Sequence, residues 1–252
     1  MRGCIFLLLL LAAVSWGLIC NRIDGRLKQI DAGNGQVFGV GHSGMVVTRR
    51  GAHWLRVPGN LAHVTVGPAG VWGVDRAFTV YKLVGGSWAI MAGHLKQIDA
   101  GGDQIIAGVS RRNTVFCASK QQAVRAASYL SPAYRRVPGG MKYYSCGPKA
   151  CWGLNSAGYI YLRDHVSSNF CVGSHWRRIG GRLAMVEVGT DGSVYGINRC
   201  GRVYRRVGIS TKRPDGTAWR HMNFPGRRFR HLSADLGILW LVEVNGSIIR
   251  CQ

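Results

Sequence analysis

Acidic side chains are scarce in this sequence of 252 residues, which holds 11 Asp and Glu against 33 Lys and Arg. Its only glutamates are Glu187 and Glu243. Chemistry that needs paired carboxylates, such as glycoside hydrolysis, therefore has few candidate residues. The sequence also lacks a G-x-S-x-G motif, and its histidines are scattered. These absences predict a protein that is not an enzyme and has no catalytic residue.

Long apolar runs are missing beyond the first residues of the chain. The run from Ile5 to Val14 follows the basic Arg2 and precedes the small residues Ser15 and Gly17. This order predicts a secretory signal peptide over residues 1–17, because a membrane-spanning helix needs about 20 apolar residues. The mature chain, 18–252, is then expected to be one secreted, extracellular domain with no transmembrane segment.

The cysteines have no C-x-x-C spacing that would indicate a zinc site, and no acidic loop of the EF-hand type occurs. In an exported protein the default state of cysteine is therefore a disulfide. Seven cysteines follow the signal peptide: Cys20, Cys117, Cys146, Cys151, Cys171, Cys200 and Cys251. Because seven is odd, at least one of them is free or pairs with another chain.

A short strand motif recurs along the chain, usually as two apolar residues, Gly and an aliphatic residue. Its copies are Gln36–Val40, Val71–Val74, Ile106–Val109, Cys151–Leu154, Val194–Ile197 and the degenerate Leu239–Val242. Each copy follows one apolar–polar strand that ends in a small residue, and two further strands come after most copies. Internal repeats of this kind are typical of propellers and solenoids.

Four short strands in each of six repeats predict an all-β fold, a single six-bladed β-propeller. The repeats span about 25–59, 60–93, 94–139, 140–181, 182–226 and 227–252. A β-sandwich would need fewer strands and no period. The sixth repeat ends after its third strand, so residues 20–25 are expected to add the fourth strand and close the ring.

This closure places Cys20 beside Cys251 and predicts a disulfide between them. Cys146 and Cys151 flank a short turn and are expected to form a second bridge. Cys117–Cys171 is then the remaining pair. Cys200 is left as a free thiol in an exposed turn beside Arg199 and Arg202, which predicts a disulfide-linked homodimer or a mixed disulfide with a small thiol.

Several long segments resemble the fish-egg lectins, a family of tectonin-repeat propellers, and more distantly the lipopolysaccharide-binding tachylectin of horseshoe crabs. The segments are LKQIDAGGDQIIAGV (95–109), KYYSCGPKACWGLNS (142–156), VEVGTDGSVYGIN (186–198), KRPDGTAW (212–219) and SADLGILWLVEVNGSI (233–248). The resemblance implies a secreted, six-bladed lectin of innate immunity and eggs. It implies binding of N-acetylglucosamine-type sugars and bacterial envelope polymers such as lipopolysaccharide.

Two features depart from the family pattern. Family members carry cysteines where this chain has residues near Phe224 and at Glu243, which implies one lost bridge. Cys200 is an additional cysteine, in agreement with the odd count.

Arginine pairs account for much of the positive charge. They are Arg49–Arg50, Arg111–Arg112, Arg135–Arg136, Arg177–Arg178, Arg205–Arg206 and Arg227–Arg228. Guanidinium groups bind phosphate and carboxylate oxygens through two parallel hydrogen bonds. We expect an anionic-surface site at Arg49, Arg50, Arg135, Arg136, Arg177, Arg178, Arg205 and Arg206. The alternative function is that of a cationic secreted protein that binds anionic membranes or polyanions without sugar specificity. A merely solvated basic face is the third interpretation, although a formal charge of +22 exceeds what solubility requires.

Sugar recognition usually combines an aromatic face with polar hydrogen-bonding groups. The candidate pairs lie in and just after the second strand of three repeats: Trp72 with Asp75, Trp152 with Asn155, and Tyr195 with Asn198. The alternative is that the aromatic residues pack between blades and the polar residues only shape turns. Three insertions, 118–131, 162–175 and 207–218, are expected to emerge together on one face, where binding loops are often found.

Other partners and modifications receive less support from the sequence. No nucleic-acid-reading motif is present, and export argues against nucleic acid as a partner. No cofactor is indicated, although calcium bound by backbone carbonyls in a central channel stays open. Asp31 and Asp99 occupy equivalent positions of two repeats and are interpreted as turn residues. Asn245 begins an Asn-Gly-Ser sequon and is a candidate N-glycan acceptor.

Overall fold

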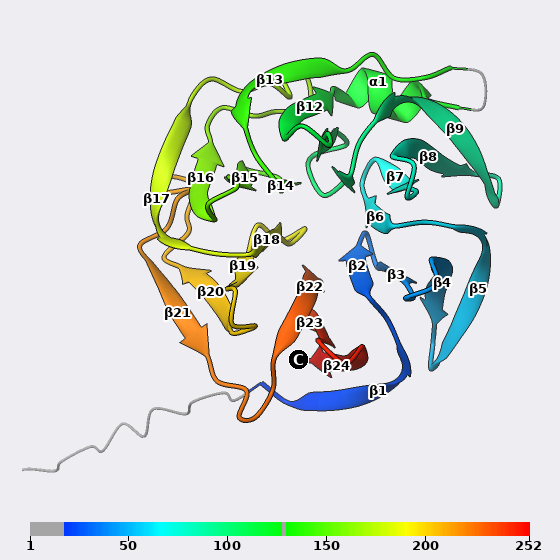
Figure 1. Cartoon of the computed structure of the whole chain (residues 1–252). Coiled ribbons are helices and arrows are strands. Elements are labelled where there is room, and N and C mark those ends of the chain that lie inside the picture. The colour runs from blue at the N-terminus through cyan, green and yellow to red at the C-terminus, as the bar shows by residue number, and fades with distance from the viewer. Residues whose placement is uncertain (1–17, 128–129) are drawn as a thin grey trace, which may run out of the picture.

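A computed structural model describes residues 18–127 and 130–252; the predicted signal peptide, 1–17, lies outside these ranges. Six antiparallel sheets of four strands each stand around a central axis, as Figure 1 shows. This arrangement confirms the all-β, six-bladed propeller predicted from the repeats. The described residues include one short helix, α1 (Lys120–Arg125).

Each blade is a meander in which the chain runs from the axis outward. The innermost strands are β2 (Gln29–Gly33), β6 (His63–Gly67), β10 (Gln97–Asp99), β14 (Tyr143–Cys146), β18 (Met185–Val188) and β22 (Phe229–Asp235). The second strands are β3 (Gln36–Val40), β7 (Gly70–Val74), β11 (Ile106–Val109), β15 (Cys151–Leu154), β19 (Val194–Ile197) and β23 (Ile238–Glu243). The third strands are β4 (Met45–Arg50), β8 (Thr79–Val84), β12 (Thr114–Ala118), β16 (Tyr159–Arg163), β20 (Val203–Val207) and β24 (Ser247–Cys251). The outermost strands are β5 (His53–Asn60), β9 (Ser87–His94), β13 (Arg135–Gly140), β17 (Trp176–Arg182), β21 (Ala218–Met222) and, in blade six, β1 (Cys20–Arg26).

The first strand of the chain closes the ring, as predicted. β1 pairs antiparallel with β24, with Cys20 opposite Cys251, and lies outermost in the last blade (Figure 1). A disulfide joins this pair. Outside the strands, the Ile19 N–H donates to the Gln252 carbonyl and the Gln252 N–H donates to the Ile19 carbonyl. Both chain ends are therefore held by the same blade.

Near the axis, side chains of one inner strand bind the backbone of the next blade. Carboxylate or hydroxyl oxygens accept backbone N–H groups: Asp31 from Val66 (2.6 Å), Thr65 from Ala100 (3.0 Å), Asp99 from Cys146 (3.0 Å), Ser145 from Val188 (3.0 Å) and Ser233 from Ala32 (3.0 Å). We call these five side chains the axial belt. Buried N–H groups without partners would cost stability, so the belt satisfies donors that no sheet reaches.

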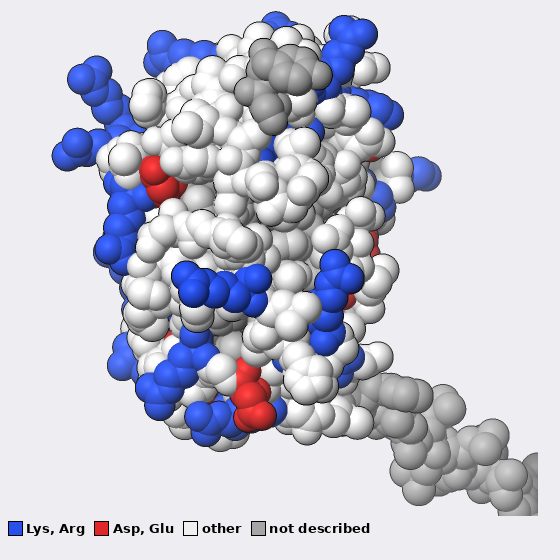
Figure 2. Space-filling model, turned by 90° about the vertical axis from the view of Figure 1, so that its right-hand side faces the viewer, with Lys and Arg blue, Asp and Glu red and all other residues white. Residues whose placement is uncertain are grey.

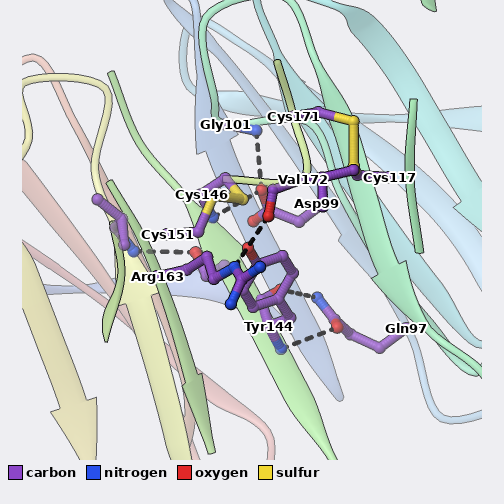
Figure 3. Close-up of a disulfide and its surroundings, with 12 residues drawn as sticks. Gln97, Asp99, Gly101, Cys117, Tyr144, Cys146, Cys151, Arg163, Cys171 and Val172 are labelled. Carbon is purple, nitrogen blue, oxygen red and sulfur yellow. Dashed lines mark hydrogen bonds between the residues drawn. A yellow bond between two sulfur atoms is a disulfide. The ribbon is translucent and has the colours of Figure 1, made fainter. Parts of the chain in front are cut away.

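Two glutamines bridge blades in the same manner. The Gln29 amide donates to the Val64 carbonyl (2.7 Å) and accepts the Val64 N–H (3.1 Å). Gln97 makes the equivalent pair of bonds to Tyr144 (2.8 and 3.2 Å; Figure 3). A primary amide has an N–H donor and a carbonyl acceptor side by side, so it can replace the backbone N–H and C=O groups of an adjacent strand.

The outer rim has its own repeated contact between blades. In five of the six blades, an aromatic residue near the start of the outermost strand packs on a glycine of the preceding blade's outermost strand: Trp54 on Gly25, Trp88 on Gly59, Tyr134 on Gly93, Trp176 on Gly139 and Trp219 on Gly181. A Cβ on Gly59 would lie 2.7 Å from Trp88 Cδ1, and its φ of +126° also favours glycine. The spacing of aromatic residues and glycines in the repeats follows from this contact.

The three insertions connect third and outermost strands, as expected. The first contains α1, and the Cys117–Cys171 disulfide ties the second to β12, the strand that precedes the first (Figure 3). Arg163 Nε donates to the Val172 carbonyl at 2.8 Å and holds the second loop against its own blade. Cys146–Cys151 closes the turn between β14 and β15, so the three bridges are the pairs expected from the sequence.

Removing the Cys20–Cys251 bridge should destabilise the protein far more than removing Cys146–Cys151. The sequence separations are 231 and 5 residues, and loop-closure entropy assigns about 5 and about 2 kcal/mol to loops of these sizes. We expect this order in urea unfolding of the two double Cys→Ser variants without reductant. Equal losses would show that the ring does not depend on the closing bridge.

Candidate functional site

The predicted sugar-binding aromatic residues lie mostly between blades. Trp72 is 0% exposed and Trp152 is 1% exposed, so neither indole offers a face to a ligand. Trp72 Nε1 donates to the Ala69 carbonyl at 2.9 Å, and Trp152 meets Trp219 edge to face. These two tryptophans pack the core, which corrects the expectation that they stack on a sugar. Tyr195 is half-buried and lies under the guanidinium of Arg205.

The predicted polar residues organise hairpin turns. Asp75 accepts the Thr79 N–H (2.8 Å), and Asn155 accepts the Tyr159 N–H (2.9 Å). Asn198 accepts N–H groups from Cys200 (2.9 Å) and Arg202 (3.0 Å). Each side chain is half-buried and uses one oxygen inside its own turn. Asp75 also accepts the Tyr81 hydroxyl at 3.1 Å.

Positive charge on the surface is largely unpaired. Across residues 18–127 and 130–252, ion pairs engage only two arginines, Arg177 and Arg227. Lys and Arg side chains also outnumber Asp and Glu on the face shown in Figure 2. The scarcity of acidic residues in the sequence thus produces a surface whose charged side chains are mostly positive.

Most of the predicted arginines lie over aromatic rings. The distances from guanidinium carbon to ring centroid are 5.3 Å for Arg49 over Trp54, 5.7 Å for Arg135 over Phe170, 4.3 Å for Arg178 over Tyr159, 5.8 Å for Arg205 over Tyr195 and 5.4 Å for Arg206 over Trp219. Stacking restrains a long side chain while its N–H edge stays free to bind oxygen. Arg50 and Arg136 are exposed beside their stacked neighbours.

Arg177 departs from this pattern. Its Nε and Nη2 atoms donate to both carboxylate oxygens of Asp164 (2.6 and 2.8 Å), and its Nη1 lies 3.4 Å from Asp215. The hydrogen bond to Asp164 raises the Arg177 pKa above its usual value. Arg177 therefore joins the loops of blades four and five, and its charge is shared with two carboxylates before any external anion binds.

Two grooves between blades bring predicted arginine pairs next to other polar groups. The first groove, of about 790 Å³, is lined by Arg49, Arg50, Arg56, Gln36 and Thr48, among others. The second groove, of about 400 Å³, is lined by Arg205, Arg206, Lys149, Asp191 and Ser193, among others. Both therefore combine guanidinium donors with neutral or acidic acceptors, as a polyhydroxylated and partly anionic ligand requires.

Three carboxyl groups lie buried near the axis. Asp31 and Asp99 are in inner strands, not in turns as the sequence suggested, and Glu187 occupies the equivalent place in β18. Burial raises the pKa of Asp31 to about 6 and that of Asp99 to about 7, and the negative charge of Asp31 adds to the shift of Asp99. Burial, followed by the charges of both aspartates, raises the pKa of Glu187 well above its ordinary value. Within the described residues, no three His, Cys, Asp or Glu side chains are arranged to hold a metal ion.

Comparisons with known proteins agree with this architecture. The model of the tectonin domain matches residues 26–244. The chain is 54% identical over 235 residues to the fish-egg lectin of Cyprinus carpio, covering 93% of this chain and 98% of that protein. The chain belongs to the tectonin family. A further relative of this tectonin, Tectonin-1 of Physarum polycephalum, is 36% identical over 59 residues, which are 23% of this chain and 24% of that protein.

Solved structures share the fold of this tectonin at low sequence identity. Virginiamycin B lyase of Staphylococcus aureus aligns with a TM-score of 0.61 and 11% identity over 93% of this chain and 99% of the lyase. Human WBSCR16 aligns with a TM-score of 0.57 and 13% identity over 90% of this chain and 72% of that protein. At such identities the likeness shows the propeller alone.

Replacing Asp99 by Asn should flatten the pH dependence of stability. A folded-state pKa near 7 means that wild-type stability falls as pH rises through that value, because the unfolded carboxyl ionises freely. Asn keeps the acceptor for the Cys146 N–H and cannot ionise. Between pH 5.5 and 8.5 we expect Asp99→Asn to lose less unfolding free energy than wild type, by at least about 1 kcal/mol.

Urea unfolding at both pH values measures this difference. Asp103→Asn, which alters an exposed acid, serves as the control and should follow wild type. If Asp99→Asn and wild type lose the same free energy, Asp99 does not carry the buried proton.

Cys200 should form disulfides outside its own chain. It is exposed and is the one cysteine of the described residues outside a bridge. Conditions that oxidise the other six cysteines to disulfides would also oxidise an exposed thiol, so we expect a linked dimer or an added small thiol. Non-reducing electrophoresis and mass measurement of wild type and Cys200→Ser test this expectation. A wild-type monomer of unmodified mass would contradict it.

Proposed function

We propose that this tectonin is a secreted lectin that binds N-acetylglucosamine-type sugars and bacterial envelope polymers such as lipopolysaccharide, in innate immune or egg defence. The observation that carries the proposal is the 54% identity to a fish-egg lectin over 93% of the chain. Binding rather than catalysis is supported by the two glutamates. Glu187 is buried near the axis, and Glu243 pairs with Arg227 at 3.2 Å.

Secretion is supported by the three disulfides, because such bridges persist in oxidising compartments. The predicted signal peptide, 1–17, would direct the chain to the secretory pathway. Among the described residues, no helix has the length and apolar character needed to cross a bilayer. Asn245 is exposed in its turn and stays a proposed N-glycan acceptor.

The two grooves between blades are the proposed binding surfaces. Their arginines supply hydrogen-bond forks for phosphate and carboxylate groups, and Gln36, Thr48 and Ser193 supply neutral partners for hydroxyls. Of the turn positions predicted from the sequence, Asp75, Asn155, Asn198 and Tyr195 keep exposed surface and stay part of the proposal. A ligand that spans several blades would gain affinity through multiple weak contacts.

The alternative function is that of a cationic secreted protein that binds anionic membranes or polyanions without sugar specificity. The unpaired arginines favour it, because a one-signed surface attracts any polyanion. The two functions differ in their response to free sugar and salt. Screening weakens exposed charge interactions, whereas a sugar site responds to a neutral competitor.

Competition on immobilised lipopolysaccharide at constant ionic strength tests the proposal. We expect free N-acetylglucosamine to displace wild-type protein and glucose to be weaker. Arg50→Gln/Arg56→Gln should bind roughly ten-fold more weakly, a loss of about 1.4 kcal/mol, because it removes two donors from the first groove. The control Arg125→Gln/Arg213→Gln removes the same charge at exposed positions outside both grooves.

Binding that no sugar displaces, that moderate salt abolishes, and that both double variants weaken equally would support the alternative instead. A glycan array with a salt titration would extend the same comparison to other sugars.

A further inference from the structure

One mouth of the central axis is ringed by basic side chains. An open cavity of about 340 Å³ lies there, between residues at the starts of the inner strands of five blades. Its basic residues are Lys28, Lys96, Lys142 and Arg230. They come from blades one, three, four and six, so the positive charge surrounds the axis instead of lying on one side. We call this cavity the axial mouth.

The floor of the axial mouth carries imidazole nitrogens without hydrogen-bond partners. His231 is 8% exposed, and its Nδ1 has no hydrogen-bond partner within the described structure. Both ring nitrogens of His63 are also buried without a partner. The two imidazole rings lie edge to face, 5.8 Å apart, and Tyr143 Oη reaches His231 Nε2 at 3.4 Å. Burial lowers the pKa of both histidines, so each ring is neutral and has one N–H donor and one acceptor nitrogen. Buried polar atoms of this kind normally have a partner, which points to an occupant of the mouth.

None of the residues that line the axial mouth is acidic. Burial lowers the pKa of Lys28, and the charges of Arg76 and Arg230 lower it further. Lys96 and Lys142 have a lowered pKa because of burial first and a neighbouring cation second. Three buried carboxyls lie deeper along the axis. Asp31 and Asp99 accept N–H groups in the axial belt, and Glu187 lies near Tyr143, whose pKa is raised by burial first and by the charge of Glu187 second. Burial raises the pKa of all three carboxyls, which limits the negative charge beneath the mouth. The cations held together at the mouth repel one another, and a bound anion would relieve that repulsion.

From this geometry we propose that the axial mouth binds a phosphate monoester. A tetrahedral dianion accepts hydrogen bonds from several directions, which matches the cations that four blades contribute to the mouth. A planar, singly charged carboxylate would engage fewer of these donors. The mouth opens to solvent, so the alcohol part of the ester projects outward without needing a pocket of its own. This site is separate from the two grooves and does not rest on the proposed sugar binding.

The test measures binding of inorganic phosphate and of phenyl phosphate by titration calorimetry at fixed ionic strength. Wild type should bind both. Lys28→Gln/Lys142→Gln should bind both at least about ten-fold more weakly, because two of the four surrounding charges are removed. Arg125→Gln/Arg213→Gln loses the same charge away from the axis and should retain wild-type affinity. Far-UV circular dichroism and the melting temperature establish that both variants are folded.

Vesicles distinguish a lipid source from a soluble ester. Phosphatidic acid presents a monoester, and phosphatidylglycerol presents a diester in the same kind of membrane. Preferential, Lys28- and Lys142-dependent binding to phosphatidic acid assigns the site to lipid headgroups. Binding of the soluble esters without any preference between the vesicles assigns it to soluble phosphates.

Two results would overturn the proposal: no heat of binding for either phosphate in wild type, or equal weakening in both double variants. Failure of the sugar site is recognised separately. Arg50→Gln/Arg56→Gln should leave phosphate binding unchanged, and Lys28→Gln/Lys142→Gln should leave displacement by N-acetylglucosamine unchanged.

Discussion

The propeller depends on satisfying buried backbone N–H groups where six inner strands meet. Each blade is a separate sheet, so the inner edge of one blade has no strand neighbour in the next. The axial belt solves this with side chains that accept N–H groups across every junction except the one after Glu187. Glycine residues in the inner strands allow the backbones of adjacent blades to approach closely. A Cβ on Gly33 would lie 2.1 Å from the Val66 carbonyl oxygen, so a larger residue there would separate the blades.

The inner strands also account for three of the few acidic residues in this basic protein. A carboxylate is a strong acceptor, but its burial disfavours the ionised form, and three carboxyls around one axis repel when ionised. Asp31, Asp99 and Glu187 alternate with Thr65, Ser145 and Ser233 around the ring. Because a hydroxyl residue occupies every second blade, no two adjacent blades both contribute a carboxyl group. This alternation limits the repulsion and still gives most junctions an oxygen acceptor.

The sequence was sufficient to predict the repeats, the closing strand and the bridge partners, because each follows from a local period or from where the last repeat stops. It was insufficient where residues of the same type have different surroundings. Trp72 and Trp54 both belong to repeated strand motifs, yet Trp72 is buried in the core and Trp54 lies at the rim under Arg49. The pairing of Arg177 with Asp164 and Asp215 joins two insertions, and no periodicity encodes such a contact. Asp31 and Asp99 were misplaced in turns because Asp is common there, whereas the belt requires an acceptor inside a strand.

The placement of the acids makes the surface more positive than composition alone indicates. Of the 11 acidic residues, Asp31, Asp99 and Glu187 face the axis, and Asp164, Asp215 and Glu243 are held by arginines. The remaining acids are too few to balance 33 Lys and Arg. The surface potential is therefore positive over much of the molecule and attracts anions without regard to their structure. Selectivity must then arise from the positions of donors rather than from charge. Stacking of arginines on aromatic rings fixes such positions at the rim, and the inner strands fix them at the axial mouth.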